Sequence, residues 1–451
     1  SNGGSNNGII LDTTGSLGGL KVKGNGSAGS GGTIANKSGA DGSTTTGSGI
    51  YLNATSNVSL AWMQLNDFQN SGIAGRSVTN FELLSSVLNG VIGNSTAQVE
   101  GPIAFGISNP GGTNGLQGTG LIRDTKVRGG VEHNLEFYNQ SGSMNLTIEG
   151  TTAPGTTSGA CEVRNNSVAG GADGIQIEMQ GSATATIAVR QCFFDDNKSQ
   201  PVQAAANDSS TIDIRIEDSV VRRTSQGNEG FVLSNGSNGD LVAHVLRNNI
   251  AGIGGAAIFV GQTPGNATTS SSLTAVIQGN VIDHPTTATN SAILAWFTST
   301  VGQVAPANVL IDGNTVAERS TGGVSRGIFV DTPDVNTTPG FTATVTNNSV
   351  SVHDNVLAVN GIAAQARRGT GCFDIRNNAV TYPNGTPGGV LGLRLRQAAP
   401  EPGSPGVANL EQGASAGTAA TVLAANNPAS STEVLGTVTV VGNNSCSPPP
   451  S

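Results

Sequence analysis

The stretch that decides the fold reads Val345-Thr-Asn-Asn-Ser-Val350: an aliphatic residue, a polar residue, two turn residues, one variable residue and a second aliphatic residue. Clear copies of this six-residue phrase begin at Val163, Ile277, Ile311 and Ile375, and looser copies begin at Ile122, Val189, Ile216 and Leu246. From Val163 on, the steps between successive copies range from 26 residues (163 to 189) to 34 residues (277 to 311). A period of this size, made of β-forming residues, is typical of a stacked repeat protein.

The two aliphatic residues of each phrase are five positions apart, which is an odd spacing. On a straight strand, residues at odd spacing point to opposite faces. Both positions are aliphatic in nearly every copy, so both are expected to enter the same core. The chain must then bend between them. Asn, Asp and Gly fill the turn positions in most copies, and these residues tolerate the left-handed backbone of a tight corner.

The fourth position of the phrase predicts an asparagine ladder. Asn side chains on successive coils, about 4.8 Å apart, can hydrogen-bond amide to amide. In the copies at Val189 and Ile216, Cys192 and Ser219 take this position instead. The predicted ladder consists of Asn166, Asn249, Asn280, Asn314, Asn348 and Asn378.

A second strand follows each corner and begins, for example, at Gly327-Ile328 and Gly361-Ile362. Two or three short strands per turn, all wound one way, predict an all-β fold: a single-stranded right-handed parallel β-helix, or solenoid, with an internal asparagine ladder and a long loop insertion.

The expected divisions follow the composition. Residues 1–48 form Gly/Ser/Asn-rich N-terminal coils or a cap, residues 49–396 form the β-helix, and residues 434–445 form its final coil. Residues 397–433 are a Pro/Ala/Gly-rich loop insertion, with a capping subdomain as the alternative, and residues 446–451 resemble a linker. The sequence starts at Ser1 without a signal peptide, and we interpret it as a processed or excised piece.

The formal net charge of −9 argues against nucleic acid and anionic membranes as partners, because no basic patch is evident in the sequence. No apolar run reaches the length of a membrane span. The even number of cysteines, Cys161, Cys192, Cys372 and Cys446, fits an oxidising compartment. Their offsets within the repeat do not match, so the register gives no pairing, and buried free thiols are the alternative.

Candidate catalytic and metal-binding residues are few. Asp195-Asp196 is the best pair of carboxylates for glycosidic chemistry, but adjacent Asp residues are usual in turns. Arg367-Arg368 could supply a lyase base, but no acidic cluster lies near it in the sequence. We therefore predict no catalytic residue.

We likewise predict no metal site and no cofactor. The four histidines, His133, His244, His284 and His353, have unrelated offsets and no zinc-ligand spacing. Calcium at surface turns, for example around Asp331 and Asp334, is the alternative.

The phrases at 163–168, 311–316 and 375–380, with the Gly-Ile strand starts, resemble the right-handed parallel β-helix repeats of the pectate-lyase-like superfamily. The Gly/Asn/Ser/Thr-rich composition more narrowly resembles large surface proteins of Gram-negative bacteria, including autotransporter-type passenger regions. The resemblance covers about residues 49–445 and is strongest over 161–380. It implies the fold, but no catalytic residue carries over, because none of the family's enzymatic signatures is matched.

These observations predict a non-catalytic extracellular structural protein of a bacterial surface, fibre or matrix. It would act in adhesion or self-assembly, with self-association through coil ends or residues 397–433 and with other surface components or glycans as further partners. The alternative is a carbohydrate-active β-helix protein, either a polysaccharide lyase or hydrolase or a glycan-binding module. That alternative draws on four aromatic residues that could face sugars: Trp62, Trp296, Tyr138 and Tyr382.

Overall fold

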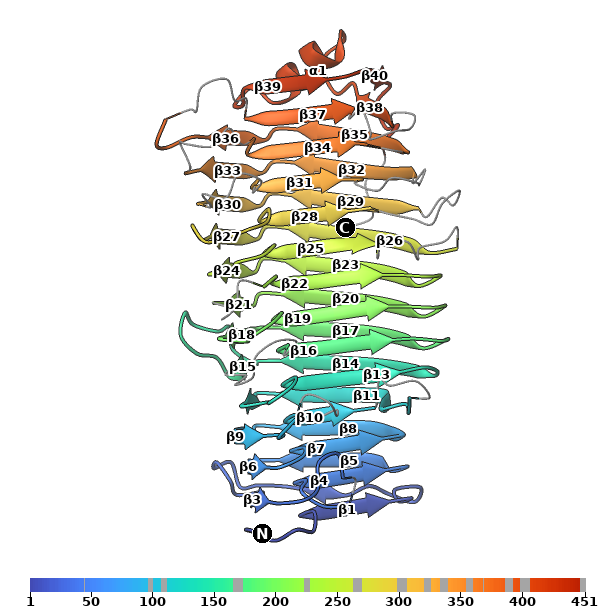
Figure 1. The fold of residues 1–451 in the computed structure, drawn as a ribbon, viewed down its shortest axis with the longest axis vertical. Coiled ribbons are helices and arrows are strands. Elements are labelled where there is room, and N and C mark those ends of the chain that lie inside the picture. Colours follow the sequence, from blue (N-terminus) through green and yellow to red (C-terminus); the bar gives the residue numbers. More distant parts are fainter. Residues whose placement is uncertain are drawn as a thin grey trace. The chain divides into compact units, whose positions relative to one another are not determined.

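The computed structural model describes residues 1–43, 45–95, 100–106, 112–164, 173–222, 228–262, 270–297, 306–319, 326–332, 340–353, 360–367, 369–385, 392–397 and 406–446. The chain forms two compact units, residues 1–205 with 210–226 (unit 1) and residues 206–209 with 227–451 (unit 2). Each unit is built from three parallel sheets whose strands follow one another in chain order (Figure 1). The predicted right-handed parallel β-helix is therefore confirmed for both units.

In unit 1, each coil contributes one strand to each sheet. The first sheet contains β1 (Ile9–Asp12), β4 (Ile50–Asn53), β7 (Ile73–Arg76), β10 (Ile103–Phe105), β13 (Leu135–Asn139), β16 (Ile175–Met179) and β19 (Val202–Ala206). The second contains β2 (Lys21–Val22), β5 (Ser56–Ala61), β8 (Val78–Leu84), β11 (Leu116–Arg123), β14 (Ser143–Glu149), β17 (Thr184–Arg190) and β20 (Thr211–Glu217). The third contains β3 (Gly32–Lys37), β6 (Met63–Phe68), β9 (Val87–Ile92), β12 (Lys126–Arg128), β15 (Cys161–Arg164), β18 (Cys192–Asp195) and β21 (Val220–Val221).

Unit 2 repeats this plan. Its first sheet contains β22 (Phe231–Asn235), β25 (Ile258–Gln262), β28 (Ile293–Trp296), β31 (Ile328–Asp331), β34 (Ile362–Ala366), β37 (Leu393–Gln397) and β39 (Thr432–Leu435). The second contains β23 (Asp240–Leu246), β26 (Ser272–Gln278), β29 (Ala307–Asp312), β32 (Gly340–Thr346), β35 (Thr370–Arg376), β38 (Val407–Glu411) and β40 (Val438–Val441). The third contains β24 (Asn249–Ala251), β27 (Val281–His284), β30 (Thr315–Glu318), β33 (Ser349–Val352) and β36 (Ala379–Thr381).

The repeated phrase forms the corner between the second and third sheets. In the copy at Ile311, both aliphatic residues are buried, Ile311 at 0% and Val316 at 1% exposure, so the chain does bend between them. The residue two positions after the first aliphatic residue has a left-handed backbone. The residues in this position, with φ between 46° and 67°, are Trp62, Ser85, Asp124, Gln191, Asp218, Arg247, Gly279, Gly313, Asn347 and Asn377. Trp and Arg rarely adopt this backbone conformation. The hydrogen bonds between coils therefore determine the conformation of the corner more than the residue type at this position does.

The glycines before the first-sheet strands have a packing reason. A Cβ atom added at Gly327 would lie 2.4 Å from Val350 Cγ1, and one at Gly361 would lie 2.4 Å from Val380 Cγ1. Only glycine lets these strands approach the third sheet so closely. The Gly-Ile pairs of the sequence therefore mark the points where the narrow core closes.

Two copies of the phrase, at Val163 and Leu246, do not lie at the position in the coil that the spacing of the repeats predicts. Val163 pairs with Phe194 in the third sheet, while Ile148 takes the place before the corner and pairs with Val189. In the looser copy at Leu246, the preceding residue, Val245, pairs with Ile277 and begins the corner. A six-residue phrase encodes a bend but not which corner of the coil it belongs to, so insertions such as residues 150–160 shift its position.

Residues 397–433, predicted as a protruding loop, contain strand β38 and helix α1 (Ala419–Asn426) within their described part. Thr418 caps this helix, since its hydroxyl accepts a hydrogen bond from the Thr421 N–H at 3.3 Å. Val422 and Leu423 are 0% exposed. The helix lies next to β39 and β40 at the end of unit 2 (Figure 1).

Candidate functional site

The asparagine ladder runs along the corner of unit 2. The Asn314 amide donates to the Asn348 Oδ1 atom at 3.0 Å and to the Ile277 carbonyl at 2.9 Å. The Asn314 Oδ1 atom accepts from the Asn280 amide at 2.9 Å. Asn378 continues the series to Asn427, which lies at the end of α1. These side-chain amides thus form hydrogen bonds with buried backbone groups that water cannot reach, which is a structural role.

Asn249 does not belong to the ladder. Its side chain is exposed, and Asn248, at 1% exposure, takes the ladder position and donates to Asn280 Oδ1 at 3.0 Å. The error has the same cause as the misplaced start at Leu246, because an alignment that is one residue late assigns the wrong Asn of an Asn-Asn pair. Asn166 lies outside the described residues.

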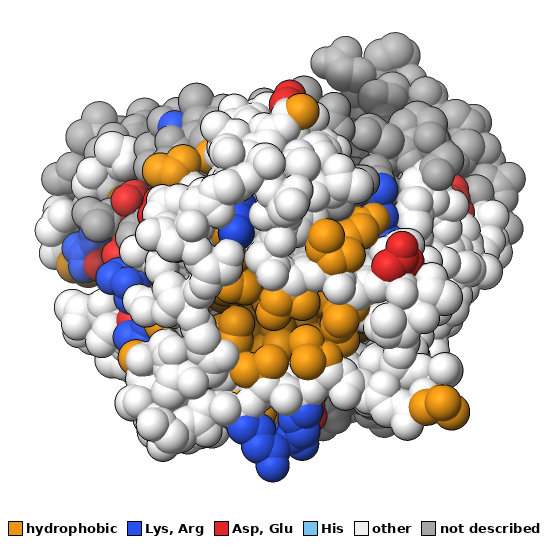
Figure 2. Space-filling view, turned by 90° about the horizontal axis from the view of Figure 1, so that it is seen from below, with side chains coloured by type: hydrophobic (Ala, Val, Ile, Leu, Met, Phe, Trp, Pro, Cys, Tyr) orange, Lys and Arg blue, Asp and Glu red, His pale blue; other side chains and the backbone are white. Residues whose placement is uncertain are grey.

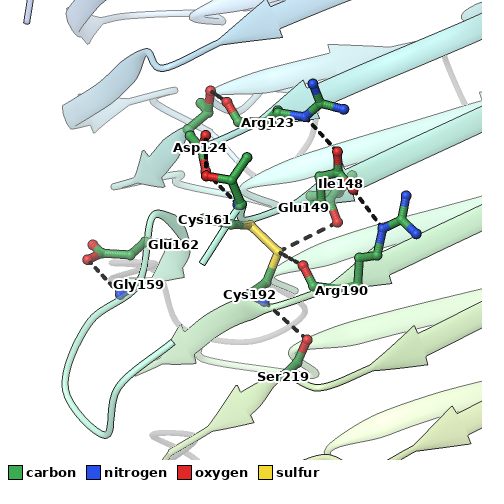
Figure 3. The surroundings of a disulfide bond; sticks show 12 residues. Arg123, Asp124, Ile148, Glu149, Gly159, Cys161, Glu162, Arg190, Cys192 and Ser219 are labelled. Atoms are coloured by element: carbon green, nitrogen blue, oxygen red, sulfur yellow. Dashed lines mark hydrogen bonds and ion pairs between the residues drawn. A yellow bond between two sulfur atoms is a disulfide. The ribbon is translucent and has the colours of Figure 1, made fainter. Parts of the chain in front are cut away.

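Unit 1 uses other side chains at the same corner position. Hydroxyls bond the coils, since the Ser86 Oγ atom accepts from the Met63 N–H at 3.0 Å and the Ser219 Oγ atom accepts from the Cys192 N–H at 3.2 Å. Cys161 and Cys192 are neighbours in register and form a disulfide with a Cα–Cα distance of 4.7 Å (Figure 3). The register does therefore give this pairing, once Val163 is placed in the third sheet.

A column of alternating charges runs beside this disulfide on the outer side of unit 1. The Glu149 carboxylate lies between Arg123 and Arg190, with both Nε atoms at 2.6 Å (Figure 3). Burial favours the neutral form of Glu149, but hydrogen bonds and charge from the two arginines outweigh it and lower the pKa of the carboxyl. Each charge here is matched by its neighbour on the next coil, so this column also joins coils.

The second disulfide, Cys372–Cys446, fastens residues after β40 to strand β35, with a Cα–Cα distance of 5.3 Å. The Cys446 N–H also donates to Glu411 Oε2 at 3.0 Å. All four cysteines are thus paired, and none is a free thiol.

The remaining sequence candidates are dispersed. Asp195 ends β18 and Asp196 forms the turn with φ 58°, as expected of turn residues. His284 is fully buried between Glu318 Oε2 and the Gly255 carbonyl, each at 2.7 Å, whereas His133 lies in unit 1. Among the described residues, no three His, Cys, Asp or Glu side chains are placed to hold a metal ion.

The aromatic candidates occupy four different settings. Tyr138 is 1% exposed and donates to Gln180 Oε1 at 3.0 Å, so it is not available to a sugar. Trp62 forms a corner, and Tyr382 follows β36. Trp296 alone among them lies on the outer side of the first sheet of unit 2, partly buried against an apolar cluster.

We call this outer side the arginine–aromatic face, defined by Phe259, Trp296, Arg326, Phe329, Asp331, Arg367, Arg394 and Arg396. Its order follows from the register, which aligns Phe259, Leu294, Phe329, Ala363 and Arg394 in one outward column and Trp296, Asp331, Gln365 and Arg396 in the next. The Arg326 guanidinium lies 4.3 Å from the centre of the Phe329 ring. Arginines and aromatic rings therefore share the outer side of this sheet.

The charges of this face are unevenly matched. Asp331, at 0% exposure, pairs with Arg367 at 3.0 Å and accepts from the Gln365 amide at 2.8 Å. Burial, with help from the positive charges of Arg394, Arg367 and Arg396, lowers the pKa of Arg326. Arg326, Arg367, Arg394 and Arg396 thus lie close to one another, and Arg394 pairs with Glu433 at 2.6 Å. Such a set of guanidinium groups suits carboxylate or sulfate ligands.

A second cluster lies in unit 1 around β13. Glu136 is 5% exposed, and no described residue donates a hydrogen bond to its carboxyl group. Burial, with the charges of Glu132, Glu178 and Asp173, raises the pKa of Glu136 to about 8. Burial raises the pKa of Glu132 and of Asp173 to about 7 each. At neutral pH, Glu136 is thus a protonated acid beside partly ionised carboxylates, a combination that can serve acid–base chemistry.

Neither cluster was predicted from the sequence. The arginines come from separate coils, and Arg367 was considered only as part of the Arg367-Arg368 pair, whose second residue is outside the described part of the chain. A usable signal was Leu393-Arg-Leu-Arg396, because its alternation places both arginines on the outer side of a strand. Asp331, named with Asp334 as the alternative calcium position, does not lie in a surface turn, since it is buried and paired with arginine; Asp334 is not among the described residues.

Within the described part of the chain, no helix has the length and hydrophobicity needed to cross a bilayer. Comparisons of the chain with family models, with curated proteins and with solved structures found no match.

Proposed function

We propose that this protein is a non-catalytic extracellular adhesion protein of a bacterial surface or matrix, and that its arginine–aromatic face binds an acidic polysaccharide. The observation that carries the proposal is the gathering of Arg326, Arg367, Arg394 and Arg396 beside Trp296 and Phe329 on one face of an otherwise acidic chain. Guanidinium groups pair with uronic carboxylates in bidentate fashion, and aromatic rings pack against sugar rings.

The extracellular setting is supported by the disulfides, because both would be reduced in most cytosols. The structural part of the proposal is supported by the use of polar groups in both units. Asparagine amides, serine hydroxyls and ion pairs join one coil to the next, which suits a scaffold that displays a binding face.

The test is binding of the chain to polygalacturonate and alginate, with dextran as the neutral polymer. We expect the double variant R394A/R396A to weaken binding at least about tenfold, because a charge-assisted contact contributes about 1.5 to 3 kcal/mol. The control is Arg215→Ala in unit 1, an exposed arginine outside this face that pairs with Glu217. Equal binding of wild type and R394A/R396A would refute the proposed face.

A glycoside hydrolase is the second candidate function, favoured by the protonated Glu136 beside other carboxyl groups. It ranks below binding because Glu136 is only 5% exposed, so a substrate would have to displace what covers it. Assays for new reducing ends and for unsaturated sugars on the same polymers distinguish the two. Reducing ends that disappear in Glu136→Gln would establish the hydrolase, and unsaturated ends would indicate a lyase.

A further inference from the structure

Three basic side chains surround one buried carboxylate on the outer side of the third sheet of unit 1. Lys126 of β12 pairs in register with Glu162 of β15. Two residues further along the same strands, Arg128 pairs with Arg164, so the four side chains form a two-by-two block. Val127, which lies between Lys126 and Arg128, points inward, is 1% exposed and pairs with an equally buried valine of β15. The core of the β-helix therefore holds both strands of the block in place.

All three basic side chains are directed toward the Glu162 carboxylate, which is buried. The Lys126 Nζ atom lies 3.4 Å from Oε1, and the Arg164 Nε atom lies 3.5 Å from Oε2. Arg128 donates to Oε2 from both Nε, at 3.2 Å, and Nη2, and the Gly159 N–H donates to Oε1 at 3.4 Å (Figure 3). Burial favours the neutral form of Glu162, but the three cations outweigh it and lower the pKa of the carboxyl. Glu162 is therefore ionised at neutral pH.

The Glu162 carboxylate does not use all the hydrogen-bond donors around it. A guanidinium group carries five N–H donors and an ammonium group carries three. Among the described residues, no hydrogen bond joins Nη1 of Arg128 or either Nη atom of Arg164 to a partner, and Nε of Arg164 is buried without one. The side chains of Lys126, Arg128 and Arg164 are 37%, 22% and 25% exposed, so solvent reaches these groups.

The block carries an excess of two positive charges, because three cations share one carboxylate. The next charged residues on this sheet, Asp195 and Arg222, do not remove the excess, since the charge of Asp195 acts on Arg222. Basic residues are scarce in this chain, with 21 Lys and Arg among 451 residues. Figure 2 shows a face on which most described side chains are uncharged and lysines and arginines occur in small groups. Among the described ion pairs of unit 1, no other carboxylate has three cationic partners.

A phosphate monoester matches the charge and the donors of this block. It carries about −1.5 to −2 charges at pH 7 and has three terminal oxygens that accept hydrogen bonds. Arg128 and Arg164 are about 4.8 Å apart across the sheet, so both guanidinium groups can reach one such ester. A sulfate ester has the same shape but a single negative charge, and a carboxylate has a single charge and only two oxygens. The block therefore fits the doubly charged ester best.

We infer that Lys126, Arg128 and Arg164 bind the phosphate monoester group of a ligand through the donors that Glu162 leaves over. Glu162 keeps the three cations together, since they would otherwise repel one another. The inference is independent of the proposed glycan binding, because the block shares no residue with the arginine–aromatic face.

The test is titration calorimetry of the protein with glucose 6-phosphate, and with glucose 6-sulfate and glucose for comparison. We expect glucose 6-phosphate to bind at about pH 7.5, where the ester is doubly charged, and Arg164→Ala to weaken this binding at least about tenfold. This variant should keep its fold, since Lys126 and Arg128 still pair with Glu162. Arg164→Lys keeps the charge but not the fork of donors, so its affinity should be intermediate. The control Arg215→Ala removes the same charge from unit 1 outside the block and should leave the affinity unchanged.

Binding should also weaken as the pH falls from about 7.5 to about 5, because the ester takes up its second proton near pH 6. The lowered pKa of Glu162 keeps the block itself unchanged over this range. Absence of binding, equal affinity for glucose 6-sulfate, or equal affinity of wild type and Arg164→Ala would each overturn the inference. Loss of binding in R394A/R396A but not in Arg164→Ala would also refute it, because phosphate would then bind to unit 2.

Discussion

At the scale of single residues, stability should depend on whether an asparagine side chain belongs to the buried ladder, as that of Asn314 does, or is exposed, as that of Asn249 is. Replacement of Asn314 by Ala would remove the acceptor of the Asn280 backbone N–H, at 3.0 Å, and the side-chain donor to the Ile277 carbonyl, at 2.9 Å, in a buried corner. We expect a loss of about 2 to 4 kcal/mol in the free energy of unfolding, measured in urea. The control is Asn249→Ala, at an exposed position, with an expected loss below about 0.5 kcal/mol. Equal losses in both variants would contradict the assignment of the ladder.

Glu136 predicts a dependence of stability on pH. Its pKa of about 8 in the folded protein lies above the ordinary value of 4.5, so the folded state keeps this proton to a higher pH than the unfolded chain does. The contribution to stability is complete below about pH 4.5 and is lost as the pH rises through 8. His133, whose pKa burial lowers to about 4, stays neutral above about pH 6.5. Between about pH 6.5 and 8, the buried carboxyl groups therefore dominate the change.

The variant Glu136→Gln removes the group that titrates last. We expect it to reduce the fall in unfolding free energy over this pH range, by up to about 1.4 kcal/mol per pH unit. Denaturation at about pH 6.5 and about pH 8.5 measures the effect. The control is Glu149→Gln in the same unit, which should leave the slope of the wild-type profile in this pH range unchanged, because the arginines beside Glu149 lower its pKa. A profile in Glu136→Gln as steep as that of the wild type would show that Glu136 does not hold its proton.

At the scale of strands and corners, the sequence predicts those features that residues close together in the chain determine. Aliphatic pairs around Asn-Asn or Gly-Asn predict the bend, and the paired positions Leu60 and Leu83, 23 residues apart, lie side by side in β5 and β8. Position along the coil depends on insertions, so Val163 and Leu246 were placed in the wrong register. The arginine–aromatic face and the Glu136 cluster combine residues 30 or more positions apart, such as Phe329 and Arg394. Only the coil register brings these together, and loops of variable length hide that register in the sequence.

The Cys161–Cys192 bond occupies the corner position that hydroxyls hold elsewhere in unit 1, so its removal should depend on the replacement. Loss of a cross-link over a separation of 31 residues costs about 3 to 4 kcal/mol in the chain-entropy model. Serine can still bond as Ser219 does, whereas alanine cannot. We expect C161S/C192S to be about 1 kcal/mol more stable than C161A/C192A in guanidinium denaturation. The reverse order would show that this position needs no polar atom.

At the scale of the whole molecule, the net negative charge of the chain and the positive charge of the arginine–aromatic face have opposite effects on an acidic polysaccharide. The net charge of −9 repels an acidic polysaccharide at long range, whereas the four arginines attract its carboxylates at contact. The Debye length is about 30 Å at 0.01 M salt, about 8 Å at 0.15 M and about 3 Å at 1 M. Moderate salt therefore screens the distant repulsion before it weakens the contact pairs. The affinity for the acidic polysaccharide therefore depends on the salt concentration, which decides whether the long-range repulsion, the short-range attraction or neither is screened.

We therefore expect the affinity for polygalacturonate to rise from low to physiological salt and to fall again toward 1 M. Titration calorimetry at about these three salt concentrations measures this dependence. In R394A/R396A two of the four contact charges are removed and the formal net charge becomes −9 − 2 = −11, so residual binding should only strengthen as salt screens repulsion. A steady fall in wild-type affinity from the lowest salt upward would mean that the local positive charge dominates at every distance. The basic face, and not the acidic chain around it, would then determine how the polymer approaches.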